Sequence, residues 1–126
     1  MTIAEAIAAV DRLKENQYSN EDKVRMLSDL DGKLMNIVFR RHEGNPYESW
    51  QPYDLYQDGG DTAQLLVPDP YSHLYVTFLS YNIDLLNGEY ERYNNTAAVY
   101  NTELQDFISY WKREHLPLQK AKIRMG

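Results

Sequence analysis

A helical repeat of large side chains, which continues through the second half of the chain, limits the possible folds more than any other feature. Between residues 75 and 111, large or apolar residues recur every three or four positions, and polar Asn82 fills the one gap. The repeat consists of Tyr75, Leu79, Leu86, Tyr90, Tyr93, Ala97, Tyr100, Leu104, Phe107 and Trp111. The span corresponds to about ten turns at 3.6 residues per turn, so the helical phase is preserved throughout.

This repeat crosses the segment NGEYERYNN, residues 87–95, whose Asn-Gly pair is typical of a turn. Two arrangements are open. The first is one helix of about 44 residues, which would be about 66 Å long and would exceed the width of a domain of this size. The second is two helices, over about 71–93 and 96–114, with the break at Gly88 or at Asn94–Asn95.

Capping signals define two further helices and the start of the long repeat. Thr2 and Glu5 form a capping box, followed by apolar residues on one face, which predicts a helix over about 3–15. Ser19 opens a second apolar stripe and predicts a helix over about 19–42. Asp69, followed by Pro70, predicts where the third helical region begins. The fold class is therefore all-α, a small bundle of three to four helices.

The 27 residues from 43 to 69 show no sustained periodicity and predict a long irregular loop. Aromatic residues in this loop, Trp50, Tyr53 and Tyr56, make it too apolar for a simple linker. We expect one helical domain over residues 1–116 and a basic tail over residues 117–126. Within this tail, Lys120, Lys122 and Arg124 are candidates for contact with an acidic partner.

Charge and composition exclude several classes of protein. The net charge is −6; residues 112–126 sum to +4, so the remaining residues sum to −10, which argues against general nucleic-acid binding. No apolar run approaches the roughly 20 residues that span a bilayer, so we expect no membrane contact. Cysteine is absent, and the first residues lack the pattern of a signal peptide. We therefore expect synthesis in the cytoplasm.

No arrangement of residues predicts a catalytic, cofactor or metal site. Signatures for nucleophilic serine hydrolases, nucleotide-binding loops and zinc proteases are missing. The three histidines, His42, His73 and His115, are far apart in the sequence, near predicted helix ends, where capping is the commoner role. Asp54, Asp58 and Asp61 lie around a Gly-Gly pair, but the spacing of a calcium loop is not met. We expect a protein without enzymatic activity and without a cofactor.

Tyrosine is over-represented, with 11 residues against three Phe and two Trp. Tyrosine combines apolar area with a hydroxyl that can stay hydrated, so it suits half-buried helix faces and protein–protein interfaces. The acidic and basic residues between the tyrosines of residues 87–95 would form a polar rim or a solvated helix face. The candidate interface residues are Tyr90, Arg92, Tyr93, Tyr100, Trp50, Tyr53 and Tyr56.

The segment over residues 65–111 begins LLVPDPYSHLY, continues through NGEYERYNN and ends in FISYW. It resembles a group of small proteins encoded in prophages of Gram-positive bacteria, and residues 20–34, NEDKVRMLSDLDGKL, resemble the second helix of that group. These proteins are similar to head–tail connector, or neck adaptor, proteins of tailed phages. The resemblance implies a virion structural protein that forms a ring and contacts portal, tail or neck components in the virion neck. The alternative is a small helical regulatory or nucleic-acid-binding protein encoded in a prophage.

Overall fold

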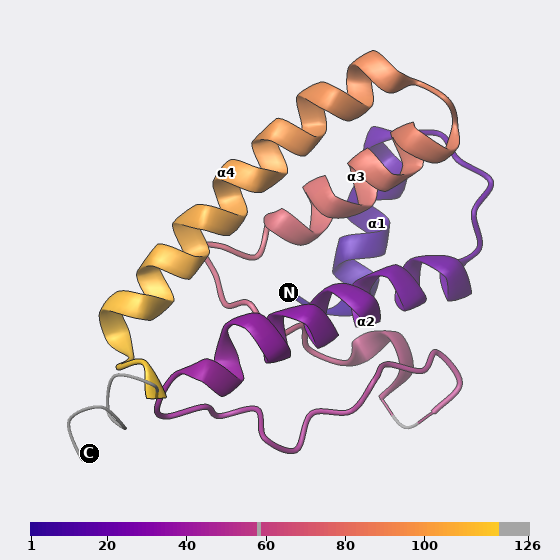
Figure 1. Ribbon diagram of the computed structural model, residues 1–126. Helices are drawn as coiled ribbons and strands as arrows, with labels where there is room; N and C mark the ends of the chain where they lie inside the picture. The colour runs from indigo at the N-terminus through magenta and orange to yellow at the C-terminus, as the bar shows by residue number, and fades with distance from the viewer. Residues whose placement is uncertain (58, 119–126) are drawn as a thin grey trace.

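A computed structural model describes residues 1–57 and 59–118, and it is all-helical, as the sequence predicts. Four α-helices follow one another along the chain: α1 (Ile3–Leu13), α2 (Asn20–Ile37), α3 (Leu74–Leu86) and α4 (Tyr90–Glu114) (Figure 1). Two short 3-10 helices, η1 (Phe39–Arg41) and η2 (Gly60–Thr62), lie in the connection between α2 and α3. The predicted tail contacts Lys120, Lys122 and Arg124 lie outside the described residues.

The first two helices begin at the predicted caps. The Thr2 hydroxyl accepts a hydrogen bond from the Glu5 amide, and the Glu5 carboxylate accepts one from the Thr2 amide, which completes the capping box. Ser19 caps α2 by accepting from the amide of Asp22. The predicted N-termini of these two helices are therefore confirmed to within one residue.

The second helix ends at Ile37, so the predicted end near residue 42 is wrong by one turn. The chain tightens into η1 after Val38, and the Phe39 ring becomes fully buried. That ring lies edge-on to Tyr47 and to Trp111, with ring centroids 4.9 and 4.8 Å away. Packing of Phe39 between the loop and α4, which no local pattern encodes, decides where α2 stops.

The long repeat is split between two antiparallel helices, α3 and α4, which form a helical hairpin (Figure 1). The break lies at Gly88, one of the alternatives left open by the sequence. The single long helix and the break at Asn94–Asn95 are both wrong, because Asn94 and Asn95 are exposed residues within α4. The uninterrupted phase is therefore a coincidence of two amphipathic helices.

The turn of the hairpin is closed by a Schellman motif. Gly88 has φ of 74°, and its amide donates to the carbonyl of Leu85 at 3.1 Å, while the amide of Glu89 donates to the carbonyl of Asp84 at 2.9 Å. Glycine adopts this left-handed conformation without the strain that a Cβ would add. The Asn-Gly signal was correct, although the helical phase argued against it.

The third helix begins at Leu74, so Asp69 and Pro70 do not start it. Asp69 instead accepts a hydrogen bond from the hydroxyl of Ser72, and the amide of Tyr71 bonds to the carbonyl of Pro68 at 2.9 Å. These bonds form a turn before the helix, and the side chain of Asp69 is used within that turn. Asp69 and Pro70 therefore mark the turn that leads into α3, about one helical turn before the helix itself begins.

Helix α3 is at the centre of the molecule and packs against α1, α2 and α4. The core combines the apolar faces of all four helices with three consecutive residues of the loop, Leu65, Leu66 and Val67. Its largest fully buried side chains are Tyr75, Phe39, Phe107, Ile3, Leu27, Leu34, Met35, Leu74, Leu79 and Ile83.

We call residues 43–69 the strap, because this segment runs beneath α2 and returns to α1 (Figure 1). At its far end, the amide of Leu65 donates to the carbonyl of Met1 at 2.9 Å, and the amide of Ile3 donates to that of Ala63 at 3.1 Å. At its start, the amide of Glu43 donates to the carbonyl of Leu116 at 2.8 Å. The strap is thus fixed to both ends of the described chain.

Candidate functional site

The predicted interface residues fall into two groups that lie far apart. Tyr90, Arg92 and Tyr93 lie at the turn of the helical hairpin, which is at the top of Figure 1. Trp50, Tyr53 and Tyr56 lie on the strap, along the opposite side of the molecule (Figure 1). The structure therefore presents two candidate surfaces, and Tyr100 belongs to neither of them.

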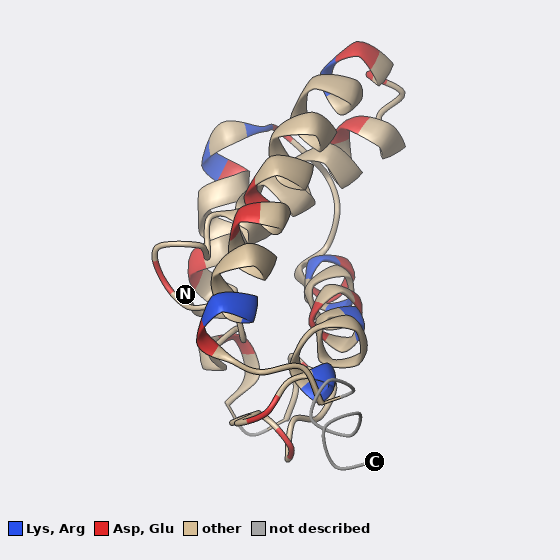
Figure 2. Ribbon diagram, turned by 60° about the vertical axis from the view of Figure 1, so that its left-hand side comes forward, with Lys and Arg blue, Asp and Glu red and all other residues tan. Residues whose placement is uncertain are grey.

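We call residues 85–95 the hairpin tip, the first candidate surface. Within NGEYERYNN, eight of the nine residues are exposed and only Tyr93 is half-buried. Leu86 and Tyr90 are 56% and 64% exposed, and Leu85 beside them is 40% exposed, so three large apolar or aromatic side chains gather at this turn. Charged residues surround them, including the Arg92–Glu89 pair at 3.5 Å (Figure 2). Apolar groups inside a polar rim are typical of protein–protein contact surfaces.

A buried ion pair supports the hairpin tip from below. Asp84 is completely buried in α3, and Lys14 at the end of α1 lies 2.9 Å from its Oδ1. The Thr96 hydroxyl of α4 donates to Oδ2 of the same carboxylate at 3.4 Å. The Tyr18 hydroxyl also donates to Asn87 at 3.0 Å. Three helices are thus joined directly behind the exposed residues, which limits the movement of the tip.

Tyr100 is not part of a free surface, so its assignment to the interface is wrong. The side chain is only 6% exposed and stacks on Tyr81, with ring centroids 5.2 Å apart. Phe78 lies edge-on to it at 5.5 Å. Burial of the ring raises the pKa of the Tyr100 hydroxyl. Most of the repeat therefore packs α3 against α4, and its exposed part is confined to Leu86 and Tyr90, at the turn between the two helices.

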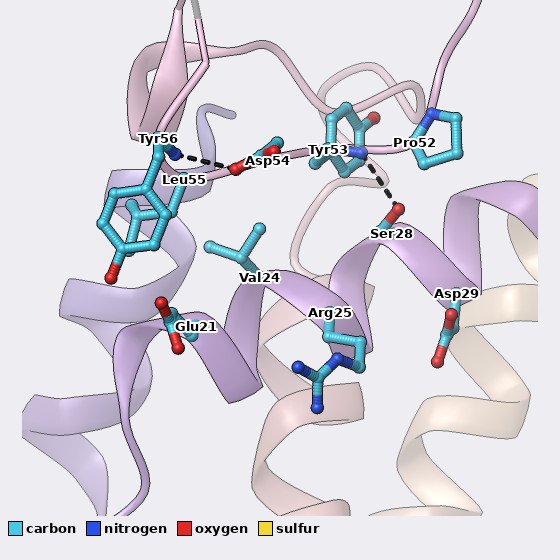
Figure 3. A pocket seen from close by; sticks show the side chains of 10 residues that line it. All are labelled: Glu21, Val24, Arg25, Ser28, Asp29, Pro52, Tyr53, Asp54, Leu55 and Tyr56. Atoms are coloured by element: carbon cyan, nitrogen blue, oxygen red, sulfur yellow. Dashed lines mark hydrogen bonds between the residues drawn. The ribbon is translucent and has the colours of Figure 1, made fainter.

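The second candidate surface is a groove between α2 and the strap, with a volume of about 370 Å³ (Figure 3). We call it the strap groove. Its lining residues are Glu21, Val24, Arg25, Ser28, Asp29, Pro52, Tyr53, Asp54, Leu55 and Tyr56. The amide of Tyr53 donates to the hydroxyl of Ser28 at 3.0 Å, and the amide of Tyr56 donates to Asp54 Oδ1 at 2.9 Å (Figure 3). The first bond fixes the strap to α2, and the second forms a turn within the strap.

The strap groove is acidic. Glu21, Asp29 and Asp54 are exposed on it, and Arg25 is its one basic lining residue. Tyr56, 75% exposed, covers one end, and a hydrogen bond to Glu21 together with the charge of that carboxylate raises the pKa of the Tyr56 hydroxyl. Among the described residues, no group of three or more His, Cys, Asp or Glu side chains is placed so that it could hold a metal ion.

Trp50 lies beside the groove, against α2 rather than in solution. A Cβ added to Gly32 would meet its ring at 3.5 Å, an ordinary contact distance, so the indole packs directly over this turn of α2. Tyr53 lies edge-on to Trp50 at 5.6 Å. Trp50 is therefore half-buried, and it holds the strap on α2 more than it offers a surface for a partner.

Asp31, which the sequence analysis did not single out, is the polar centre beneath the strap. Its carboxylate is fully buried and accepts hydrogen bonds from the hydroxyls of Tyr53 and Tyr75 and from the amide of Leu66. The Tyr75 hydroxyl in turn accepts from the amide of Val67 at 2.8 Å. Burial raises the pKa of Asp31, and the hydrogen bonds from the two tyrosines and Leu66 oppose that rise.

The position of Asp31 on α2 could have signalled its role. It lies between Leu30 and Leu34 on the apolar stripe of that helix, where a charged residue requires a partner. Its hydrogen bonds satisfy loop amides and tyrosine hydroxyls, and with no exposed surface it cannot touch a substrate. The chemistry of this carboxylate is therefore structural: it fastens the strap to α2 and α3.

The histidines do not form a joint site. His42 is buried, with Nδ1 2.6 Å from the Val38 carbonyl, and His115 stacks on Trp111 at 3.8 Å. His73 pairs with Glu103 on the surface at 2.9 Å. The sequence reading, in which the histidines lie at helix ends, is confirmed by these positions.

Comparison with models of protein families, with curated proteins and with solved structures found no match to this chain. In the described part of the chain, no helix is both long enough and apolar enough to cross a membrane.

Proposed function

We propose that this protein is a non-enzymatic structural component of a tailed-phage virion, acting as a head–tail connector in the neck between portal and tail. The observation that carries the proposal is the position of NGEYERYNN. This segment is the most specific part of the resemblance to prophage-encoded virion proteins, and it forms the exposed hairpin tip. A segment that served only to fill the core would be buried.

The shape of the tip supports this role. The exposed Tyr90 and Leu86 offer apolar area that a partner can cover, and the charged residues around them can set its orientation. The buried Lys14–Asp84 pair and the Schellman turn keep the tip rigid, so little conformational entropy is lost when a partner binds. A connector requires such a preorganised contact on an otherwise compact helical body.

The proposed partners are portal, tail or neck proteins and further copies of this chain in a ring. The protein would be made in the cytoplasm of the bacterial host and would reside in the virion neck after assembly. Its acidic body weighs against the alternative, a regulatory or nucleic-acid-binding protein.

Mass spectrometry of purified virions from the encoding phage tests the proposal. We expect the protein in mature particles at a constant ratio to the portal protein. A phage that carries Tyr90→Ser with Arg92→Ser should yield separate heads and tails in negative-stain microscopy. Gln105→Ser, at another exposed position of α4, should leave particles intact.

Two outcomes would contradict the proposal. Absence of the protein from mature virions would remove the structural role. Retention of DNA in filter binding at about 50 mM salt, where phosphate contacts are strongest, would favour the nucleic-acid-binding alternative instead.

A further inference from the structure

The strap groove combines an apolar floor with an acidic rim. Val24, Pro52 and Leu55 supply the apolar part, and the exposed carboxylates of Glu21, Asp29 and Asp54 supply the rim. Figure 2 marks acidic residues both on α2 and on the irregular segment that passes below it. Such a groove fits an extended peptide with one apolar and one basic face.

Arg25 is the only basic residue in the lining, and its charge is directed elsewhere. Its guanidinium lies 3.7 Å from Asp22 on the neighbouring turn of α2. In Figure 3 its side chain extends away from Pro52 and Tyr53. The net charge of the lining, with three acids and one base, remains −2.

The last residues of the chain have the matching pattern. Residues 120–125 read KAKIRM, so Lys120, Lys122 and Arg124 alternate with Ala121, Ile123 and Met125. Successive side chains of an extended chain point to opposite faces. An extended conformation would therefore place all three basic residues on one face and the three apolar residues on the other.

We propose that the strap groove binds residues 119–126 of a second copy of this chain. Ala121, Ile123 and Met125 would cover Val24, Leu55 and the tyrosine rings, while the basic residues would face the carboxylates of the rim. Both the charge and the apolar pattern of the occupant match the groove. The aromatic walls, Tyr53 and Tyr56, can also contact the stems of lysine and arginine.

Chain length indicates that the occupant comes from another copy. Pro117 pairs with His42, beyond the C-terminal end of α2, whereas Glu21 and Tyr56 mark the groove at the N-terminal end of that helix. Glu21 and Ile37 are about 24 Å apart along α2 at 1.5 Å per residue. Lys122 lies four residues beyond Leu118 and can extend only about 14 Å. Lys120 and Lys122 therefore do not reach Glu21 of their own chain, whereas a second copy can present its groove to them without this limit.

A tail that enters the groove of the next copy makes a head-to-tail contact, which closes into a ring or continues as a filament. For its biological meaning the inference rests on the proposed connector role, because it supplies the contact between ring subunits. The contact itself is a property of the isolated protein. Failure of the isolated protein to self-associate would contradict the tail–groove contact alone. Absence of the protein from virions would contradict the connector role alone.

Charge reversal in the full-length chain tests the contact. The tail variant carries Lys120→Glu, Lys122→Glu and Arg124→Glu, and the groove variant carries Glu21→Lys with Asp54→Lys. In light scattering at about 50 mM salt, we expect the average mass of the wild-type protein to rise with protein concentration. In each variant, the dissociation constant for self-association should rise by about tenfold or more. A mixture of the two variants should form a heterodimer, because the reversed tail then matches the reversed groove.

A matched control distinguishes this contact from a general effect of charge. Lys112→Glu with Arg113→Glu changes exposed basic residues at the end of α4 and should leave association unchanged. A wild-type chain that stays monomeric, a tail variant that associates normally, or an equal loss in the control would each overturn the proposal. If the groove variant fails to fold, the tail variant alone still tests the proposal, because normal association of the tail variant would overturn it.

Cross-linking gives an independent measurement, because the chain contains no cysteine. A mixture of Ile123→Cys and Tyr56→Cys chains, each with a different affinity tag, should form a disulfide-linked heterodimer on mild oxidation. Replacing Tyr56→Cys by Gln105→Cys, on the exposed face of α4, should abolish the product. Equal cross-linking to both positions would contradict a specific tail–groove contact.

Discussion

The hydroxyl of Tyr75 in α3 donates a 2.6 Å hydrogen bond to Asp31 in the middle of α2, and both side chains are fully buried. Through this bond the carboxylate that fastens the strap is also fixed to the central helix. The strap is therefore coupled to the hydrophobic core and is not an independent loop.

We expect Asp31→Asn to destabilise the fold by about 2–3 kcal/mol, because its amide group would face donors and leave buried polar groups unpaired. Urea unfolding followed by circular dichroism measures the effect. Asp29→Asn, two residues earlier on the exposed face of α2, should change the free energy of unfolding by less than about 0.5 kcal/mol. Equal effects would show that Asp31 does not act through its buried bonds.

We expect Tyr53→Phe to loosen the strap without unfolding the helices. The substitution removes one of the three donors to Asp31 and leaves the ring contact with Trp50 in place. Limited proteolysis should then cut between residues 44 and 61 faster than in the wild-type chain, which should resist. Tyr90→Phe serves as the control, because that side chain is exposed and lies outside the strap. Rapid cleavage of the wild-type strap would mean that it does not pack as described.

The same substitution at two glycines should have opposite effects. Gly88→Ala places a Cβ at a φ of 74° and should destabilise the protein by about 1–2 kcal/mol. Gly32→Ala lies within α2, where its Cβ would meet the Trp50 ring at an ordinary contact distance of 3.5 Å, and should stabilise by up to about 1 kcal/mol. Thermal or urea unfolding of both variants decides this, and a neutral Gly88→Ala would argue against the Schellman turn.

We expect the tyrosine repeat to separate into core and surface residues. Tyr100→Ala removes a buried aromatic ring and should destabilise by about 3–5 kcal/mol, whereas Tyr90→Ala should change stability by less than about 0.5 kcal/mol. Chemical unfolding measures both. A large stability loss in Tyr90→Ala would place the hairpin tip in the core and weaken its assignment as a contact surface.

Acid should weaken the pair between Asp11 and Lys23. Burial opposes ionisation of Asp11, but hydrogen bonds from Lys23 and Asn16 and the charge of Lys23 lower its pKa below the ordinary 3.8. A lowered pKa in the folded state means that this stabilisation is present above pH 3.8 and is lost as the pH falls through the folded pKa.

Asp11→Asn should therefore destabilise the protein at pH 7, by about 1–2 kcal/mol, because Lys23 is left buried without its partner. The difference from the wild-type chain should shrink as the pH falls below 3.8. Asp22→Asn, whose partner Arg25 is exposed, should have little effect at either pH. Urea unfolding across pH 2–7 measures these differences, and a constant difference for Asp11→Asn would exclude the pair as the cause.

Sequence signals of short range were reliable. The capping box at Thr2, the cap at Ser19 and the Asn-Gly turn at residues 87–88 each depend on bonds to residues three to five positions away. The periodicity of large residues was a less reliable guide to burial, because it shows which residues share a helix face but not whether another element covers that face. Tyr90 and Tyr100 belong to the same repeat, yet one faces solvent and the other the core.

The sequence by itself determined that the chain is helical, where its first two helices begin and that an irregular aromatic segment follows the second helix. Only the tertiary structure decided that α3 and α4 fold back on each other, that Phe39 ends α2, and that Asp31 fastens the strap. The physical reason is distance along the chain: Asp31 meets Tyr75 across 44 residues, and no local periodicity encodes which groups meet over such a separation.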